Sequence, residues 1–242
     1  IDDLYQGNAL LTAGWFGNDL VTLFVAVPVL LVSLILSMRG SRRARLVWLG
    51  MLLYMLYNFA YYLFGAAFNS FFLLYVAIFD LSMFALLFAL VRLDVVEIGR
   101  QFVPATPARW IAGYMVFMAA GLSVVYGAQA LHFVTTGEVP EIVTLTGHLT
   151  NIVFALDLSL VVPWFILGAI WLWQRRPWGY VLATILNVKG AVYMLALSAV
   201  TVSAVRAGAS DDLGQVGLWG FIGVVSLVAS IVLLRNLSPA RE

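Results

Sequence analysis

Residues 178–205 read WGYVLATILNVKGAVYMLALSAVTVSAV, and this run is long enough to cross a bilayer as one helix. A hydrocarbon core about 30 Å thick requires roughly 20 apolar residues at about 1.5 Å per residue. The only charged residue in the run is Lys189, which lies near its middle. The stretch therefore predicts a transmembrane helix with an ammonium group buried at mid-depth.

The rest of the chain has the same character. Of its 242 residues, 63% are apolar and 10% are charged, and the mean hydropathy is +1.01. Soluble domains are closer to half apolar and a quarter charged. We therefore expect an all-α, polytopic transmembrane helix bundle that forms a single domain over residues 1–242. Seven spans are expected, at about 20–37, 46–66, 71–91, 109–131, 149–173, 178–205 and 215–235.

The arginines orient this bundle. With alternating loops, eleven arginines fall on one side and only Arg206 falls on the other. Cytoplasmic loops are enriched in Lys and Arg, so the arginine-rich side is predicted to be cytoplasmic. The N-terminus is then outside and the C-terminus cytoplasmic. Because the chain begins at Ile1 rather than Met, we also expect a signal peptide, a disordered start or a further helix upstream.

Polar groups inside the spans mark where a site is expected. A central lysine or aspartate in a transmembrane helix costs about 2.5–3.5 kcal/mol, so such residues are functional candidates. Asp80 is the expected partner of Lys189, and Asp157 is expected one or two turns outward. Helical spacing and depth add further candidates for a substrate or ion site, namely Asn58, Tyr54, Tyr61, Tyr193 and Trp164. The alternative is that Lys189 and an aspartate only pin helices together.

Prolines and glycines suggest how the helices are shaped and packed. Pro28 and Pro163 lie inside spans one and five and predict kinks, or broken helices of the kind found in transporters. Spans one to three could correspond to spans four to six as an inverted repeat, or to spans five to seven as a parallel repeat. Small residues at packing intervals are expected at helix contacts, and these are Gly113, Ala120, Gly127, Gly214, Gly217, Gly220 and Gly223.

The sequence gives little support for an enzyme. It has no cysteine, which excludes disulfides, iron–sulfur clusters and thiol catalysis. No nucleotide-binding, hydrolase or metalloprotease motif occurs, so we assign no catalytic residue and no cofactor. A zinc site is a weak alternative to solvated loop residues, with His132, His148, Glu138 and Glu141 as its ligands.

Three functions remain open. The first is a small proton- or ion-coupled transporter with a Lys/Asp site at the midplane. The second is a structural or accessory subunit of a larger membrane complex. The third is a retinal-type chromophore protein in which Lys189 forms the Schiff base and Asp80 is the counter-ion. The expected partners are the lipid bilayer and either other membrane proteins or further copies of this chain, with no nucleic acid.

Two segments resemble known sequences. Residues 56–76, LYNFAYYLFGAAFNSFFLLYV, and residues 179–190, GYVLATILNVKG, are similar to uncharacterised multi-pass proteins of the bacterial inner membrane. The resemblance implies a location in the bacterial cytoplasmic membrane and names no activity.

Overall fold

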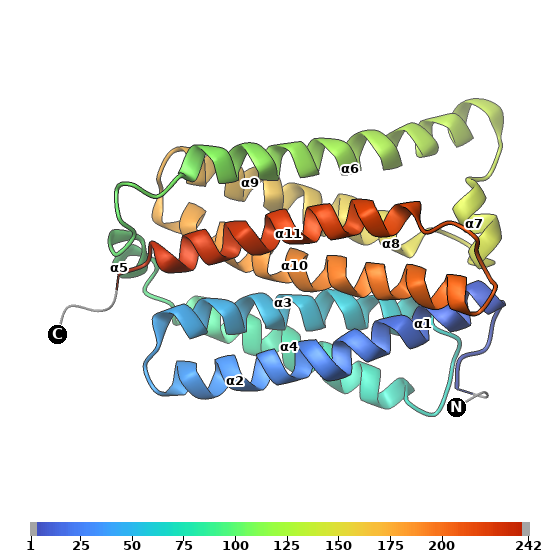
Figure 1. Cartoon of the computed structure of the whole chain (residues 1–242), viewed down its shortest axis with the longest axis horizontal. Helices are drawn as coiled ribbons and strands as arrows, with labels where there is room; N and C mark the ends of the chain where they lie inside the picture. Colours follow the sequence, from blue (N-terminus) through green and yellow to red (C-terminus); the bar gives the residue numbers. More distant parts are fainter. Residues whose placement is uncertain (1–3, 239–242) are drawn as a thin grey trace.

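The computed structural model describes residues 4–238 and is a bundle of α-helices that lie alongside one another (Figure 1). Within those residues, seven helices are long and apolar enough to cross a membrane, which confirms the all-helical, seven-span fold. The first begins at Ala9, well before the predicted residue 20. The seven are Ala9–Met38, Arg42–Gly65, Phe72–Val91, Ala108–Thr136, Ile152–Trp173, Pro177–Arg206 and Gly214–Arg235.

Spans one and five are each built from three segments. Span one comprises α1 (Ala9–Val21), η1 (Thr22–Ala26) and α2 (Val27–Met38), and span five comprises α8 (Ile152–Leu156), η2 (Asp157–Val161) and α9 (Val162–Trp173). The other spans are α3 (Arg42–Gly65), α4 (Phe72–Val91), α6 (Ala108–Thr136), α10 (Pro177–Arg206) and α11 (Gly214–Arg235). The short helices α5 (Val95–Arg100) and α7 (Glu141–Thr146) lie at opposite ends of the bundle (Figure 1).

Helix α10 forms the centre of the bundle and packs against α1, α3, α9 and α11. Its residues 179–189 are all buried. At Gly50 of α3, an added Cβ would lie only 2.6 Å from the Cβ of Val188, so glycine is required for this close approach. In contrast, Gly113 and Gly127 of α6 and Gly217 and Gly220 of α11 face open space, and the prediction that they mediate packing is wrong.

The outer surface of the bundle is apolar. Phe24, Leu73 and Phe117 on three different spans are each more than two-thirds exposed. Water would penalise so much exposed apolar surface, whereas lipid chains solvate it. The chain is therefore built to sit in a bilayer.

A proline follows a widened helical turn in both spans one and five. In η1, the amide of Val27 donates to the carbonyl oxygen of Thr22, and in η2 the amide of Val162 donates to that of Asp157. These bonds reach back five residues instead of four and define two π turns. Pro28 and Pro163 come next and have no amide hydrogen of their own. The same turn in both spans agrees with a parallel repeat in which span one corresponds to span five.

Candidate functional site

Lys189 is buried against two aromatic rings. Only 4% of the residue is exposed. Its Nζ lies 3.6 Å from the ring centroid of Tyr57 on α3 and 4.2 Å from that of Tyr193, one turn further along α10. These distances are those of cation–π contacts. Within residues 4–238, Lys189 takes part in no ion pair.

Asp157 lies on the π turn η2 and is also only 4% exposed. Its Oδ1 accepts a hydrogen bond of 2.7 Å from the hydroxyl of Tyr57, and its Oδ2 accepts one of 3.1 Å from the hydroxyl of Tyr126 on α6. The phenolic oxygens of Tyr57 and Tyr193 are 3.4 Å apart. Tyr57 therefore joins the two charges, since its ring contacts the ammonium group and its hydroxyl contacts the carboxylate.

A cavity of about 90 Å³ adjoins this cluster and has both Lys189 and Asp157 in its wall. It lies between α6, span five, α10 and α11. On its far side, the hydroxyl of Tyr114 is 2.8 Å from Oγ of Ser226 and donates to the carbonyl oxygen of Ile222 at 3.1 Å. The volume is enough for several water molecules, and although most of the wall is apolar, Lys189 and Asp157 offer them polar partners.

The structure brings together only part of the expected site. Lys189, Asp157 and Tyr193 meet, as described above. Asp80 does not join them: it is exposed on α4, and the ion pair expected between Asp80 and Lys189 is not formed. Trp164 also points away from the cluster and is 46% exposed.

The π turn explains the position of Trp164. In an uninterrupted α-helix, residue 164 would share a face with Asp157, seven residues earlier. The wide turn inserts one extra residue, so Phe165 takes that place instead. Phe165 is 6% exposed and lines the cavity beside Asp157.

Asn58 and Tyr54 belong to a second buried network, between α3 and span one. Asn58 accepts a hydrogen bond of 2.8 Å from Nδ2 of Asn18 and donates one of 3.3 Å to Oγ1 of Thr22. The hydroxyls of Thr22 and Tyr54 are 2.9 Å apart. Tyr61 stacks on the ring of Trp15 at 4.5 Å between centroids. These residues hold span one on α3 and do not contact Lys189.

Asp19 adds an acidic group to the edge of that second network. It accepts hydrogen bonds from the hydroxyls of Tyr5, at 2.5 Å, and Tyr62, at 2.6 Å. Burial, followed by this bond to Asp19, raises the pKa of Tyr5, which lies just before span one. The bonds fasten Tyr5 and α1 onto α3.

The four weak metal candidates are not gathered into one site. His132, near the end of α6, is 3.1 Å from Glu138 on the exposed loop that follows, whereas His148 contacts the carbonyl oxygen of Gly65. Glu141 begins α7. Among the residues that the structure describes, no three His, Asp or Glu side chains are placed to hold a metal ion together.

Sequence reasoning missed Tyr57 and Tyr126. The helical stripe chosen on span two followed Tyr54, Asn58 and Tyr61, which face span one, and Tyr57 lies one position away on the face toward α10. A signal was present, because an aromatic residue at the depth of a buried lysine is a cation–π candidate. No comparable signal marked Tyr126, whose role depends on how α6 packs against span five.

Comparisons of the chain with protein-family models, curated proteins and solved structures return no match. The assignment therefore rests on fold and site alone. They define a multi-pass integral membrane protein with a buried Lys–Tyr–Asp cluster beside a small cavity.

Proposed function

We propose that the protein is a proton-coupled membrane carrier in which Lys189 and Asp157 form the coupling site. The observation that carries the proposal is the separation of these two buried charges by Tyr57. An ion pair that only held two helices together would place the lysine nitrogen and a carboxylate oxygen in direct contact, because that contact best offsets the cost of burying both charges. Here each charge keeps a separate set of partners and both border the cavity.

The arrangement suits proton exchange. A proton that enters from cavity water can bind a carboxylate oxygen of Asp157 and leave by the same route. Protonation neutralises the acid closest to Lys189 and leaves the ammonium group with the aromatic rings of Tyr57 and Tyr193 alone. The charge state of Asp157 therefore controls how strongly Lys189 attracts a ligand, and this dependence is the basis of coupling.

One feature favours the carrier over a chromophore protein. The counter-ion expected for a Schiff base, Asp80, is exposed on another helix. The arginine distribution supports an orientation with the α5 end in the cytoplasm, and we place the carrier in the bacterial inner membrane.

The test uses the fact that Lys189 is the chain's only lysine. Potassium cyanate carbamylates amines that water can reach, and mass spectrometry reports the modification. In proteoliposomes, we expect carbamylation of Lys189 at a rate that changes with the direction of a pH gradient. Asp157→Asn should remove this dependence on the gradient, and Asp80→Asn, an acid within a span but outside the site, should keep it.

Two results would overturn the carrier mechanism. One is a Lys189 that cyanate modifies only after unfolding in detergent, since a permanently dry lysine cannot alternate between the two sides. The other is identical gradient dependence in Asp157→Asn and Asp80→Asn. Either result would mean that the cluster of Lys189, Tyr57 and Asp157 only holds helices together.

One observation favours a second candidate, a subunit of a membrane complex. Helix α4 lies at the edge of the bundle, packs mainly against α3, and carries the exposed Asp80 near its middle. Ionisable residues within spans rarely face lipid. We propose that a helix of another membrane protein, with a hydrogen-bond donor at this depth, covers Asp80. The test is the mass of the purified particle with and without Asp80→Leu.

A further inference from the structure

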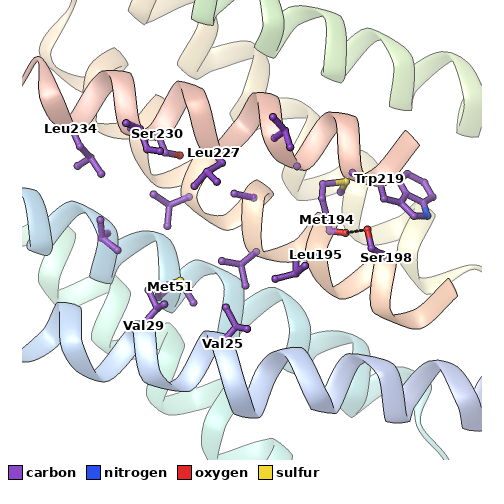
Figure 2. Close-up of a pocket in the computed structure, with 18 residues that line it drawn as sticks. Val25, Val29, Met51, Met194, Leu195, Ser198, Trp219, Leu227, Ser230 and Leu234 are labelled. Carbon is purple, nitrogen blue, oxygen red and sulfur yellow. Dashed lines mark hydrogen bonds between the residues drawn. The ribbon is translucent and has the colours of Figure 1, made fainter. Parts of the chain in front are cut away.

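A second, larger hollow runs along the outside of the bundle. This groove has a volume of about 470 Å³ and lies between span one, α3, α10 and α11. Figure 2 shows its wall, with Leu234 at one end and Trp219 at the other. Nearly every lining side chain is apolar, and Leu195, Val224 and Leu227 in its wall are about half exposed. The volume falls within the range of about 300–1,000 Å³ that is usual for ligand sites.

The groove has the length of a lipid chain. From Trp219 to Leu234, α11 advances about 22 Å at 1.5 Å per residue. One leaflet is about half of a 30 Å hydrocarbon core, or roughly 15 Å. A single extended acyl chain therefore fits along the groove.

The groove and the Lys189 cavity share two side chains. Met194 and Trp219 line both, so they stand between the groove and the cavity that has Lys189 and Asp157 in its wall. In Figure 2 both side chains lie at the same end of the groove. A Cβ added at Gly223 would lie 3.0 Å from the Cβ of Met194, so this glycine makes room for the methionine. Methionine is unbranched and adapts readily to a ligand.

The polar side of this junction is complementary to an anion. Lys189 is 4% exposed, lines the cavity, and forms no ion pair within residues 4–238. Asp157, in contrast, already receives a hydrogen bond on each of its oxygens. The charge that still lacks a partner of opposite sign in direct contact is therefore the cation.

We infer that the ligand of this site is a single-chain amphiphilic anion, namely a long-chain carboxylic acid whose chain lies in the groove and whose carboxylate passes between Met194 and Trp219 to Lys189. A cavity of about 90 Å³ suits a carboxylate better than the head group of a phospholipid. This inference rests on the proposed carrier function and names its substrate class. Protonation of Asp157 then favours anion binding, so a proton and an anion travel together.

The experiment uses 9,10-dibromostearic acid, whose bromine atoms quench indole fluorescence on contact, with the full chain in phosphatidylcholine nanodiscs. Trp219→Phe identifies the part of the quenching that comes from Trp219. Gly220→Leu fills the groove without a clash, because a Cβ there has open space. Gly217→Leu is the matched control, since it is also exposed on α11 with open space around it and does not line the groove.

We expect Gly220→Leu to weaken dibromostearate binding about tenfold and Gly217→Leu to leave it unchanged. Lys189→Met should also weaken binding of the acid about tenfold, the usual effect of losing one charge-assisted contact. The neutral analogue, dibromostearyl alcohol, should bind wild type and Lys189→Met equally. A role of Lys189 limited to packing would change the binding of both probes together.

Three results would overturn the inference. They are equal binding by Gly220→Leu and Gly217→Leu, equal affinity of the wild type for acid and alcohol, and quenching of Trp219 by dibrominated phosphatidylcholine as strong as by the acid. The last result would assign the groove to bilayer lipid. If the acid binds as expected while the rate of carbamylation of Lys189 does not depend on the pH gradient, the proposal of a proton-coupled carrier is wrong and the assignment of a long-chain carboxylic acid as ligand is kept.

Discussion

Replacing Tyr57 by Phe removes one hydrogen bond from the site and leaves the ring that Lys189 contacts. The bond from Tyr57 to Asp157 is 2.7 Å long, and its acceptor is 4% exposed. Hydrogen bonds to charged groups contribute about 1.5–3 kcal/mol in soluble proteins, and those between membrane helices contribute about 0.6 on average and at most about 1.7. A short, buried bond to a carboxylate belongs at the upper end of the membrane range.

We therefore expect Tyr57→Phe to lower the free energy of unfolding by about 1.5 kcal/mol. At about 2–4 °C per kcal/mol for a chain of this size, the thermal midpoint should fall by about 3–6 °C. The longer bond from Tyr126, at 3.1 Å, predicts a smaller loss of about 0.5 kcal/mol for Tyr126→Phe. Tyr61→Phe is the control, because the ring of Tyr61 stacks on Trp15 and its hydroxyl makes no hydrogen bond within the described residues.

The assay is unfolding in mixed micelles, followed by tryptophan fluorescence for the three single variants and for Asp157→Asn. The double variant Tyr57→Phe/Asp157→Asn completes a thermodynamic cycle and should lose less than the sum of its single changes. Two results would refute the assignment of Tyr57 as the link between the two charges. One is that Tyr57→Phe loses no more stability than Tyr61→Phe. The other is that the single changes add up in the double variant.

Three further changes test other parts of the fold. Gly50→Ala should destabilise the protein by about 1–3 kcal/mol in the same unfolding assay, because the new methyl group would lie 2.6 Å from the Cβ of Val188. Pro163→Ala restores an amide hydrogen, so the π turn should relax to an α turn and carbamylation of the lysine should lose its dependence on the pH gradient. Tyr5→Phe should lower the thermal midpoint by a constant amount from neutral pH to about pH 9, because the raised pKa of Tyr5 keeps its proton on the bond to Asp19. The stabilisation should decline above about pH 10, where the unfolded tyrosine ionises.

The sequence predicts how far along a helix a residue lies far better than it predicts which way its side chain points. Each residue of a helix adds about 1.5 Å, so the distance from a charged loop placed Asp157 within one or two turns of Lys189, and the two residues do share a cavity. The same reasoning expected Asp80 beside Lys189, but Asp80 is exposed on α4, because nothing in an apolar span says which of its faces meets lipid. That information lies in the contacts between helices.

Two local features account for the other differences. The π turn before Pro163 shifted the inward face of span five by one residue, so Phe165 replaced Trp164 in the wall of the cavity. Glycine spacing was equally ambiguous: Gly50 has no spaced partner and makes a tight contact, whereas Gly113 belongs to a regular series and faces open space. The spacing of glycines identifies one face of a helix, and only the packing of the bundle shows whether another helix contacts that face.

The exposed acid on α4 gives a last prediction that separates a lone carrier from a subunit of a complex. An aspartate at the centre of a span costs about 2.5–3.5 kcal/mol in lipid, so Asp80→Leu should make the isolated chain more stable in detergent. If a partner helix covers Asp80, the same change removes its hydrogen bond and the purified particle should lose the mass of that partner. Ser82, buried nearby on the same helix, provides a control: Ser82→Ala should leave the particle mass unchanged. An unchanged mass in Asp80→Leu, together with the gain in stability, would mean that the acid faces lipid in the assembled protein and that α4 has no partner.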